Sequence, residues 1–141
     1  MRALDAELLS ARSVTLEGHL ARLEASLPVD VADFYPGTDA GDVVALNLFL
    51  GIQIVLDLAV YACIHFGLQA PSSYDDAIAR LEHAGVLADP VADHLEKAAA
   101  LRDAFVHASD QLDPAALYRA ARVLPADLRA FIAELRYQTN G

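Results

Sequence analysis

Leucines recur every three or four residues along the first part of the chain, between residues 4 and 27. This spacing places them on one face of a helix, and Pro28 ends the pattern because proline cannot continue an α-helix. Residues 29–41 contain proline, glycine and several aspartates, and they predict a loop around a small apolar anchor, Phe34 and Tyr35. The first element is therefore predicted to be an amphipathic helix followed by a connecting loop.

The segment from Val43 to Leu68 is apolar at nearly every position. Its exceptions are Asn47, Gly51, Gln53, Asp57, His65 and Gly67. A helix of this length spans about 39 Å, which is enough to cross a bilayer. The polar residues in the middle and the lack of flanking basic residues argue against a membrane span. We favour a helix buried on several sides, by its own domain and by a second copy, with Asp39 or Asp42 as its cap.

Capping residues and prolines divide the next part of the chain into two helices. Ser72 or Ser73 is expected to cap a helix that ends at Gly85. Asp89 is expected to cap the following helix, because a proline stands next to it at the first helical position. This helix is predicted to run to about Ser109.

The last third repeats the same signal. Asp113, again followed by proline, begins a further helix, and Pro125 is expected to break or kink it before a last helix. No segment shows the sustained alternation that is typical of a strand. We predict one all-α domain over residues 1–141, an antiparallel bundle of about five to six helices.

The charges of the chain are unevenly distributed. The formal net charge is −10, made up of −11 over residues 1–96 and +1 over residues 97–141. An acidic chain is a poor non-specific ligand for nucleic acid, because such binding depends on neutralising phosphates. Any anion site is therefore expected in the last third. The single cysteine, Cys63, cannot form an internal disulfide, which favours a reducing cytoplasm.

One segment of the fourth predicted helix combines residues that suit phosphate chemistry. Arg102 and His107 lie five positions apart, about 140° around a helix and 7.5 Å along it. Arginine can clamp a phosphate, and histidine can move protons near neutral pH. Because the two side chains do not share a face, two copies meeting on a twofold axis would be needed to surround one cleft.

A structural interpretation of the same residues is also open. Arg102 then pairs with Asp103, Asp110 or Asp113, and His107 caps the end of its helix. The other four histidines have no shared metal-ligand spacing, and we interpret them as structural. They are His19, His65, His83 and His94.

The segment resembles the Arg-x4-His motif of HEPN domains, specifically that of the HepT-like ribonuclease toxins. Arg102 and His107 match the motif, and Asp103 takes the place of its usual asparagine. Four further stretches resemble the family in the same order along the chain. They are Gly51–Ala59 in the long apolar helix, the Gly-Leu-x-x-Pro-x-Ser-Tyr turn at Gly67–Tyr74, the helix end at Leu81–Leu87, and Asp113 with Leu117 and Tyr118.

The resemblance implies a helical homodimer that cleaves RNA without a metal or another cofactor. In the mechanism usually proposed for the family, the 2′-hydroxyl of the RNA attacks the adjacent phosphate and leaves a cyclic phosphate. His107 would then move protons, and Arg102 would stabilise charge on the phosphoryl oxygens. Asp103 would orient Arg102 or contact the substrate.

The resemblance also implies a partner, an MntA-like nucleotidyltransferase antitoxin that can transfer AMP to the tyrosine of the motif. This chain carries Ser109 at that position. Serine keeps a hydroxyl but reaches less far, which puts control by tyrosine AMPylation in doubt. The alternatives to an active toxin are a catalytically weak subunit that pairs with a nucleotidyltransferase, and a membrane-associated or purely structural helical dimer.

Overall fold

The structure is a computed structural model that describes residues 5–35, 37–107 and 112–140. Within these ranges the chain forms five α-helices and no strand, which confirms the predicted all-α bundle. The elements in chain order are α1 (Ala6–Ser26), the 3₁₀ turn η1 (Val31–Asp33), α2 (Asp39–His65), α3 (Tyr74–His83), α4 (Asp89–His107) and α5 (Pro114–Asn140).

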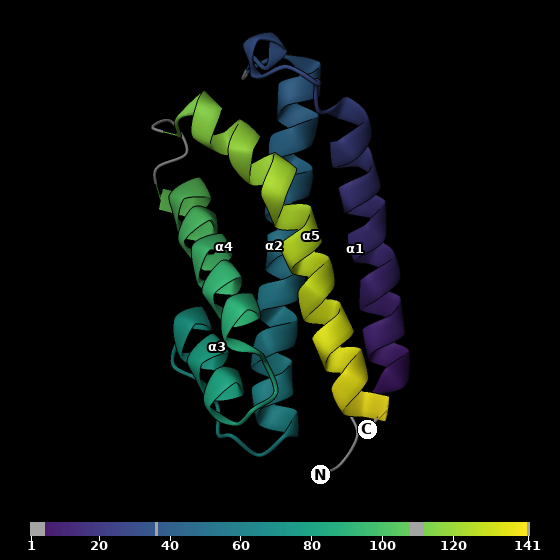
Figure 1. Cartoon of the computed structure of the whole chain (residues 1–141), viewed down its shortest axis with the longest axis vertical. Coiled ribbons are helices and arrows are strands. Elements are labelled where there is room, and N and C mark those ends of the chain that lie inside the picture. Colours follow the sequence, from purple (N-terminus) through teal and green to yellow (C-terminus); the bar gives the residue numbers. More distant parts are fainter. Residues whose placement is uncertain (1–4, 36, 108–111, 141) are drawn as a thin grey trace.

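Helix α2 is the centre of the bundle, because it contacts each of the other four α-helices. Figure 1 shows the long helices alternating in direction, so that α1 and α2 run antiparallel, as do α4 and α5. A single cluster of buried apolar side chains draws on all five helices. Its fully buried members include Leu20, Ile52, Ile78, Leu95 and Leu128.

The long apolar segment is thus a core helix of the bundle. Helix α2 is long and apolar enough to cross a membrane, but half of its most apolar stretch is buried against the other helices. Its polar residues also have partners inside the protein. Asn47, for example, accepts a hydrogen bond from His19 and donates one to the carbonyl oxygen of Val43, at 2.9 and 2.8 Å.

The start of α2 differs from the prediction. The helix begins at Asp39 and its cap is Thr38, so the expectation that Asp39 or Asp42 caps it is wrong. The Thr38 hydroxyl accepts a hydrogen bond from the Gly41 amide and donates one to the carbonyl oxygen of Tyr35. Both aspartates lie in the first turn, where their charge favours the positive end of the helix dipole.

Two of the predicted caps are confirmed. Ser73 caps α3, because its hydroxyl accepts a hydrogen bond of 3.0 Å from the Asp76 amide. Asp113 precedes α5 and accepts from the Ala115 amide at 3.3 Å. By contrast, Asp89 is already the first residue of α4, so the boundary lies one residue before the predicted one. The predicted end of α4 at Ser109 lies outside the described residues.

The sequence predicts a break or a kink at Pro125, and the structure has the kink. Helix α5 continues through Pro125 as one element, although proline removes a hydrogen bond from the helix. Buried side chains before and after the proline, Leu124 and Leu128, hold both halves against the core. The α5 ribbon changes direction along its length in Figure 1, as expected for a helix kinked by proline.

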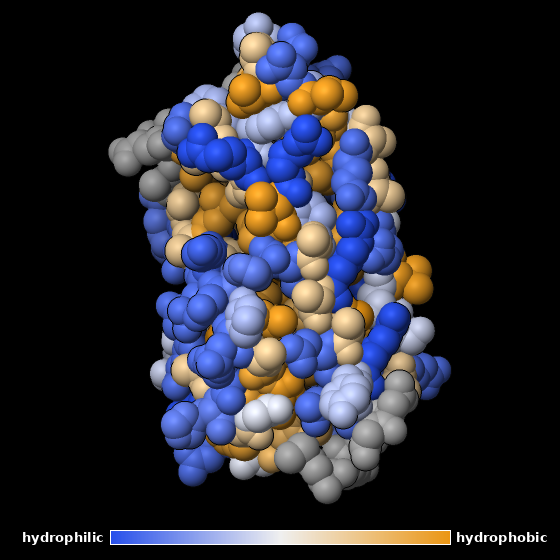
Figure 2. Space-filling view, viewed as in Figure 1, coloured by the Kyte–Doolittle hydropathy of each residue, from blue (hydrophilic) through white to orange (hydrophobic). Residues whose placement is uncertain are grey.

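The outer surfaces of the bundle differ in character. Figure 2 shows that hydrophilic side chains cover much of the face formed by α4, α5 and α1, with apolar side chains visible between them. The outer side of α2 points away from this face. There Leu46 and Ile64 are 57% and 58% exposed, so α2 leaves apolar side chains uncovered in the single chain.

Candidate active site around Arg102

The side chain of Arg102 lies over α2 and α3. Its Nε donates a hydrogen bond of 3.1 Å to Oε1 of Gln53, which lies in the middle of α2. Its guanidinium carbon lies 5.2 Å from the centre of the Tyr74 ring, within the range of a cation–π interaction. Arg102 is 25% exposed, so it is held on the protein with one side open to solvent.

The residues that hold Arg102 are themselves joined by hydrogen bonds. Nε2 of Gln53 donates to the Tyr74 hydroxyl at 2.7 Å and to Oδ1 of Asp57 at 3.0 Å. The Tyr74 hydroxyl donates to the same Asp57 oxygen at 2.8 Å. Gln53 therefore uses its oxygen for Arg102 and its nitrogen for the other two residues, which fixes the orientation of its amide.

The protonation of Tyr74 agrees with this pattern. Burial raises the pKa of the Tyr74 phenol above its ordinary value, and the hydrogen bond to Asp57 raises it further. The hydroxyl therefore keeps its proton at neutral pH and acts as the donor to Asp57. Because this hydrogen bond fixes the side chains of Tyr74 and Asp57, the Tyr74 ring forms a rigid surface under the Arg102 guanidinium.

Arg102 also pairs with its neighbour Asp103, with 3.3 Å between Nη1 and Oδ1. The carboxylate of Asp103 is largely exposed, so this pair is weak and screened by solvent. Nη2 of Arg102 makes no hydrogen bond to any residue that the structure describes. This amino group can therefore bind a phosphoryl oxygen while Nε and Nη1 keep their present partners.

A hollow of about 340 Å³ opens beside the guanidinium. It lies between α2, the start of α3 and α4. Its lining residues are Val60, Pro71, Ser72, Ser73, Tyr74, Asp75, Ala99, Arg102 and Asp103. Arg102 and the hydroxyl of Ser73 provide hydrogen-bond donors for an anion, because the hydroxyls of Tyr74 and Ser72 already donate to Asp57 and Asp76. The two aspartates of the lining limit how much negative charge the hollow can accept.

His107 lies apart from this network. It is the last residue of α4 and is exposed, and no contact between described residues joins it to Arg102.

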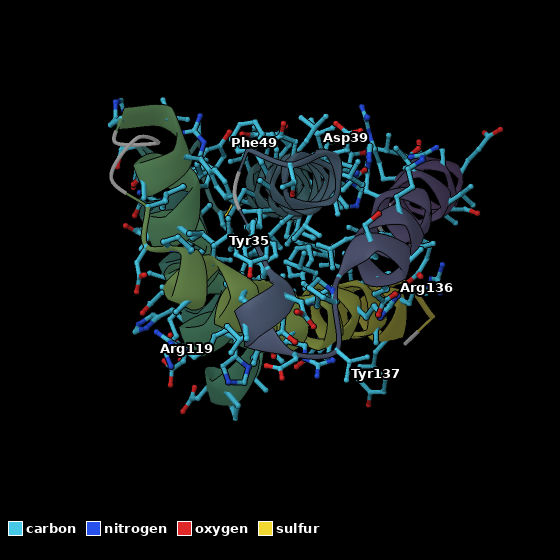
Figure 3. The ribbon with its side chains drawn as sticks, turned by 90° about the horizontal axis from the view of Figure 1, so that it is seen from above. Tyr35, Asp39, Phe49, Arg119, Arg136 and Tyr137 are labelled. Carbon is cyan, nitrogen blue, oxygen red and sulfur yellow. The ribbon has the colours of Figure 1, made fainter. Side chains whose placement is uncertain are left out.

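The end of α4 packs on α2 through two aromatic rings. Phe105 packs edge-on against Phe49 of α2, with ring centres 5.7 Å apart. Figure 3 shows Phe49 on the side of α2 that faces α4. Ser109 and Asp110 lie outside the described residues.

The other candidate ligands are held in structural contacts. His94 pairs with Asp127 at 2.9 Å, which ties α4 to α5. Cys63 is buried and donates to the Ala77 carbonyl oxygen, and burial raises the pKa of its thiol. Among the described residues, no group of three histidine, cysteine, aspartate or glutamate side chains is placed to hold a metal ion.

Gln53 and Tyr74 were not predicted to be parts of this site. A signal for Gln53 was present, because Gln53 and Asp57 are polar, four residues apart, and lie in an otherwise apolar helix. Two polar side chains on one face of such a helix indicate a polar partner on a neighbouring element. That partner, Arg102, is 49 residues further along the chain.

The helical bundle is also the fold of a solved HEPN toxin. The model of the family described as ribonuclease HepT-like matches residues 16–135, and the chain belongs to this family. No curated protein matches the chain significantly.

Solved structures with the same fold include toxins in complex with antitoxins. One is a toxin–antitoxin complex with AMP-PNP, at 21% identity and a TM-score of 0.82 over 94% of this chain and 99% of that one. Another is the tri-AMPylated HEPN toxin of Shewanella oneidensis with its MNT antitoxin, at 20% identity and a TM-score of 0.81, covering 95% and 99%. A third is YutE, a cytosolic protein of unknown function from Bacillus subtilis, at 23% identity and 0.78, covering 97% and 92%.

Proposed function

We propose that the chain, as one domain, is the toxin of a toxin–antitoxin pair and a metal-independent endoribonuclease. The observation that carries the proposal is the fixed position of Arg102. Two neighbouring helices hold its guanidinium by a hydrogen bond and a cation–π contact, and its Nη2 is left for a ligand. Membership in the ribonuclease HepT-like family supports the same conclusion.

The chemistry assigns a separate role to each motif residue. The 2′-hydroxyl of the RNA attacks the adjacent phosphorus, the bond to the 5′-oxygen breaks, and a 2′,3′-cyclic phosphate forms. His107 transfers protons in this step, and Arg102 stabilises the charge that develops on the phosphoryl oxygens. Asp103 orients Arg102 or contacts the substrate. The requirement for a 2′-hydroxyl restricts the reaction to RNA.

A homodimer completes the cleft in this proposal. Within one chain Arg102 faces α2 and α3, whereas His107 is exposed at the end of α4. An apolar groove next to the end of α4 is suited to a second copy, because its rim residues Leu46 and Val106 are 57% and 47% exposed. Ala45, Phe49 and Phe105 line the rest of this groove.

The partner we propose is a nucleotidyltransferase antitoxin. Structural neighbours of this fold occur in complexes with such proteins, and the net charge of −10 suits a basic partner surface. Ser109 is a candidate acceptor of AMP in place of the motif tyrosine. We place the complex in the cytoplasm, because Cys63 is a buried free thiol and YutE, of the same fold, is cytosolic.

One observation favours a second candidate function, that of a catalytically weak subunit which binds a nucleotidyltransferase. Asp103 lies 3.3 Å from the guanidinium of Arg102, and Asp75 lines the same hollow. These carboxylates reduce the attraction of the site for phosphate. Even the active toxin is therefore expected to bind RNA weakly, and its binding should depend little on the salt concentration because few phosphates are neutralised.

RNA cleavage by purified variants tests the proposal. The wild type is compared with His107→Ala and Arg102→Ala in the presence of a chelator, and the 2′,3′-cyclic phosphate ends are quantified. We expect both variants to lose at least about 100-fold in rate, the usual contribution of a general acid–base. His83→Ala is the matched control, because His83 is also an exposed histidine at the last residue of its helix.

Two results would decide against an active toxin. Equal cleavage by the wild type and His107→Ala would show that His107 takes no part in the reaction. Tight binding to a nucleotidyltransferase without any RNA cleavage by the free protein would favour the binding subunit. Circular dichroism of each variant shows whether a lost activity reflects a lost fold.

A further inference from the structure

A second hollow lies between α1 and α2. Its volume is about 320 Å³. Figure 3 shows that α2 lies between α1 and α4. This hollow and the one beside Arg102 therefore flank the same helix. Its walls are mainly apolar, with polar side chains among them. The lining residues are Leu8, Arg12, Thr15, His19, Leu50, Gln53, Ile54, Asp57, Leu58 and Tyr61. An apolar pocket with a few converging polar groups is the usual form of a small-ligand site.

Arg12 provides a free cation at this hollow. It is exposed, and no ion pair or hydrogen bond joins it to another residue among those that the structure describes. Arg80 and Arg129, by contrast, have the carboxylate partners Asp76 and Glu17. The flat guanidinium of Arg12 is therefore available to stack on or bond to a ligand.

The hydrogen bond between His19 and Asn47 fixes the orientation of the His19 ring and leaves Nε2 available to a ligand. The amide nitrogen of Asn47 donates to the Val43 carbonyl oxygen, so the amide oxygen of Asn47 is the atom 2.9 Å from Nδ1 of His19. An oxygen acceptor requires a proton on Nδ1. In the neutral ring Nε2 is then an acceptor, and the buried Asn47 fixes the orientation of the ring.

Two residues of α2 that line this hollow are hydrogen-bonded to residues that line the hollow beside Arg102. Gln53 lines the hollow between α1 and α2, and its amide oxygen accepts the hydrogen bond from Arg102. Asp57 also lines this hollow and accepts from Tyr74, whose ring lies under Arg102. A ligand group in the hollow and a phosphate at Arg102 would thus lie on opposite sides of one pair of side chains.

We infer that the hollow between α1 and α2 binds an unpaired nucleobase of the RNA whose phosphate lies at Arg102. The inference rests on the proposed function and extends it to substrate recognition. A base is flat, apolar on its faces and edged with donors and acceptors, and single-stranded RNA is bound by stacking such bases on aromatic or arginine side chains. A phosphate fits less well, because Asp57 brings a negative charge to the hollow.

Binding of an uncleavable single strand tests the inference separately from catalysis. The probe is a fluorescent tetranucleotide of deoxyribose, which lacks the attacking 2′-hydroxyl, and the same backbone without bases is the comparison. We expect Arg12→Ala to weaken binding of the tetranucleotide about tenfold, the effect of losing one stacked base. Arg22→Ala is the matched control, because Arg22 is an exposed arginine on the same helix that does not line the hollow.

Further measurements define the outcome. In support, the effect of Arg12→Ala disappears with the abasic strand, and the ring protons of His19 shift when the tetranucleotide is added. Equal binding by Arg12→Ala and Arg22→Ala, or no binding by the wild type, would overturn the inference. A change in oligomeric state caused by Arg12→Ala alone would also overturn it, since the hollow would then seat a second copy. The cleavage assay with His107→Ala decides the proposed function independently.

Discussion

Arg102 and Gln53, which are 49 residues apart in the chain, are joined by a hydrogen bond of 3.1 Å from Nε to Oε1. This bond connects α4 to the middle of the core helix α2. The amide nitrogen of Gln53 is bonded to Tyr74 and Asp57, so the amide cannot rotate without breaking two further hydrogen bonds. The position of the cation is therefore determined by the core of the bundle.

Gln53→Met should misplace the guanidinium while it preserves the volume of the side chain. We expect RNA cleavage to fall by at least about tenfold, because a hydrogen bond to a charged group contributes about 1.5–3 kcal/mol. Arg102 keeps its contact with Tyr74, which limits the loss. Steady-state cleavage rates measure the effect. Gln138→Met, on the last turns of α5, is the control for a glutamine-to-methionine change on this fold. Unchanged cleavage by Gln53→Met would show that Arg102 does not depend on this bond.

Tyr74→Phe separates the hydroxyl of Tyr74 from its ring. The change removes the donor to Asp57 and an acceptor of Gln53, so we expect the free energy of unfolding to fall by about 1 kcal/mol. Tyr118→Phe provides a matched control, because the Tyr118 hydroxyl donates to the carbonyl oxygens of Pro28 and Val29 away from the site.

The two tyrosine variants should differ in activity. Urea denaturation is expected to give losses of similar size, whereas only Tyr74→Phe should lower the cleavage rate. A reduced rate for Tyr118→Phe would mean that activity follows general stability and not the network around Arg102.

The contact between α1 and α5 should weaken in acid. Arg129 donates hydrogen bonds to Glu17 and Glu24 at 3.0 and 2.8 Å, and the bond from Arg129 lowers the pKa of Glu24 below its ordinary value of 4.5. A carboxyl group with a lowered pKa in the folded state stabilises the fold above its unfolded-state pKa. That contribution disappears as the pH falls through the folded-state pKa.

Comparison of wild type with Arg129→Met measures this contribution. At pH 7 the variant should be less stable by under about 1 kcal/mol, because the pair is partly exposed and screened by solvent. At an acidic pH below the lowered pKa of Glu24, the difference should shrink toward zero. A difference that stays constant between the two pH values would assign it to the packing of the arginine side chain.

The periodicity of the sequence was sufficient to predict the helices, because each long helix has a buried apolar stripe. The differences from the prediction lie at helix boundaries, where packing into the core decides in one case and a local cap decides in the other. Pro125 is a local signal for a break, but α5 continues because residues on both sides of the proline pack into the core. Helix α2 begins at Asp39 because Thr38 bonds to the loop before it as well as to the helix.

The candidate site shows the same division. Arg102 and His107 follow from the spacing of the motif, whereas the positions of Gln53 and Tyr74 depend on how α2, α3 and α4 pack. Spacing along one helix cannot predict a hydrogen bond between residues 49 positions apart. Polar residues in an apolar helix indicate that such partners exist, and only the fold identifies them.

Gly41 tests the account of how α2 begins. A Cβ at this position would collide with the carbonyl oxygen of Tyr35 and lie 3.2 Å from the Thr38 hydroxyl oxygen. Alanine is the better helix former by about 1 kcal/mol, but the collision is with backbone and with the cap itself. We therefore expect Gly41→Ala to lower the free energy of unfolding by about 1–3 kcal/mol, through overpacking and loss of the cap.

Gly18→Ala is the matched control and should change stability in the opposite direction. Gly18 lies inside α1, where a Cβ would meet only the end of the flexible Arg22 side chain, at 3.9 Å. The gain in helix propensity is then unopposed, and the free energy of unfolding should rise by up to about 1 kcal/mol. Urea denaturation of both variants measures the two changes in the free energy of unfolding, which should have opposite signs. Equal stabilisation by the two alanines would mean that the turn before α2 adjusts freely, and that Thr38 does not fix the start of the helix.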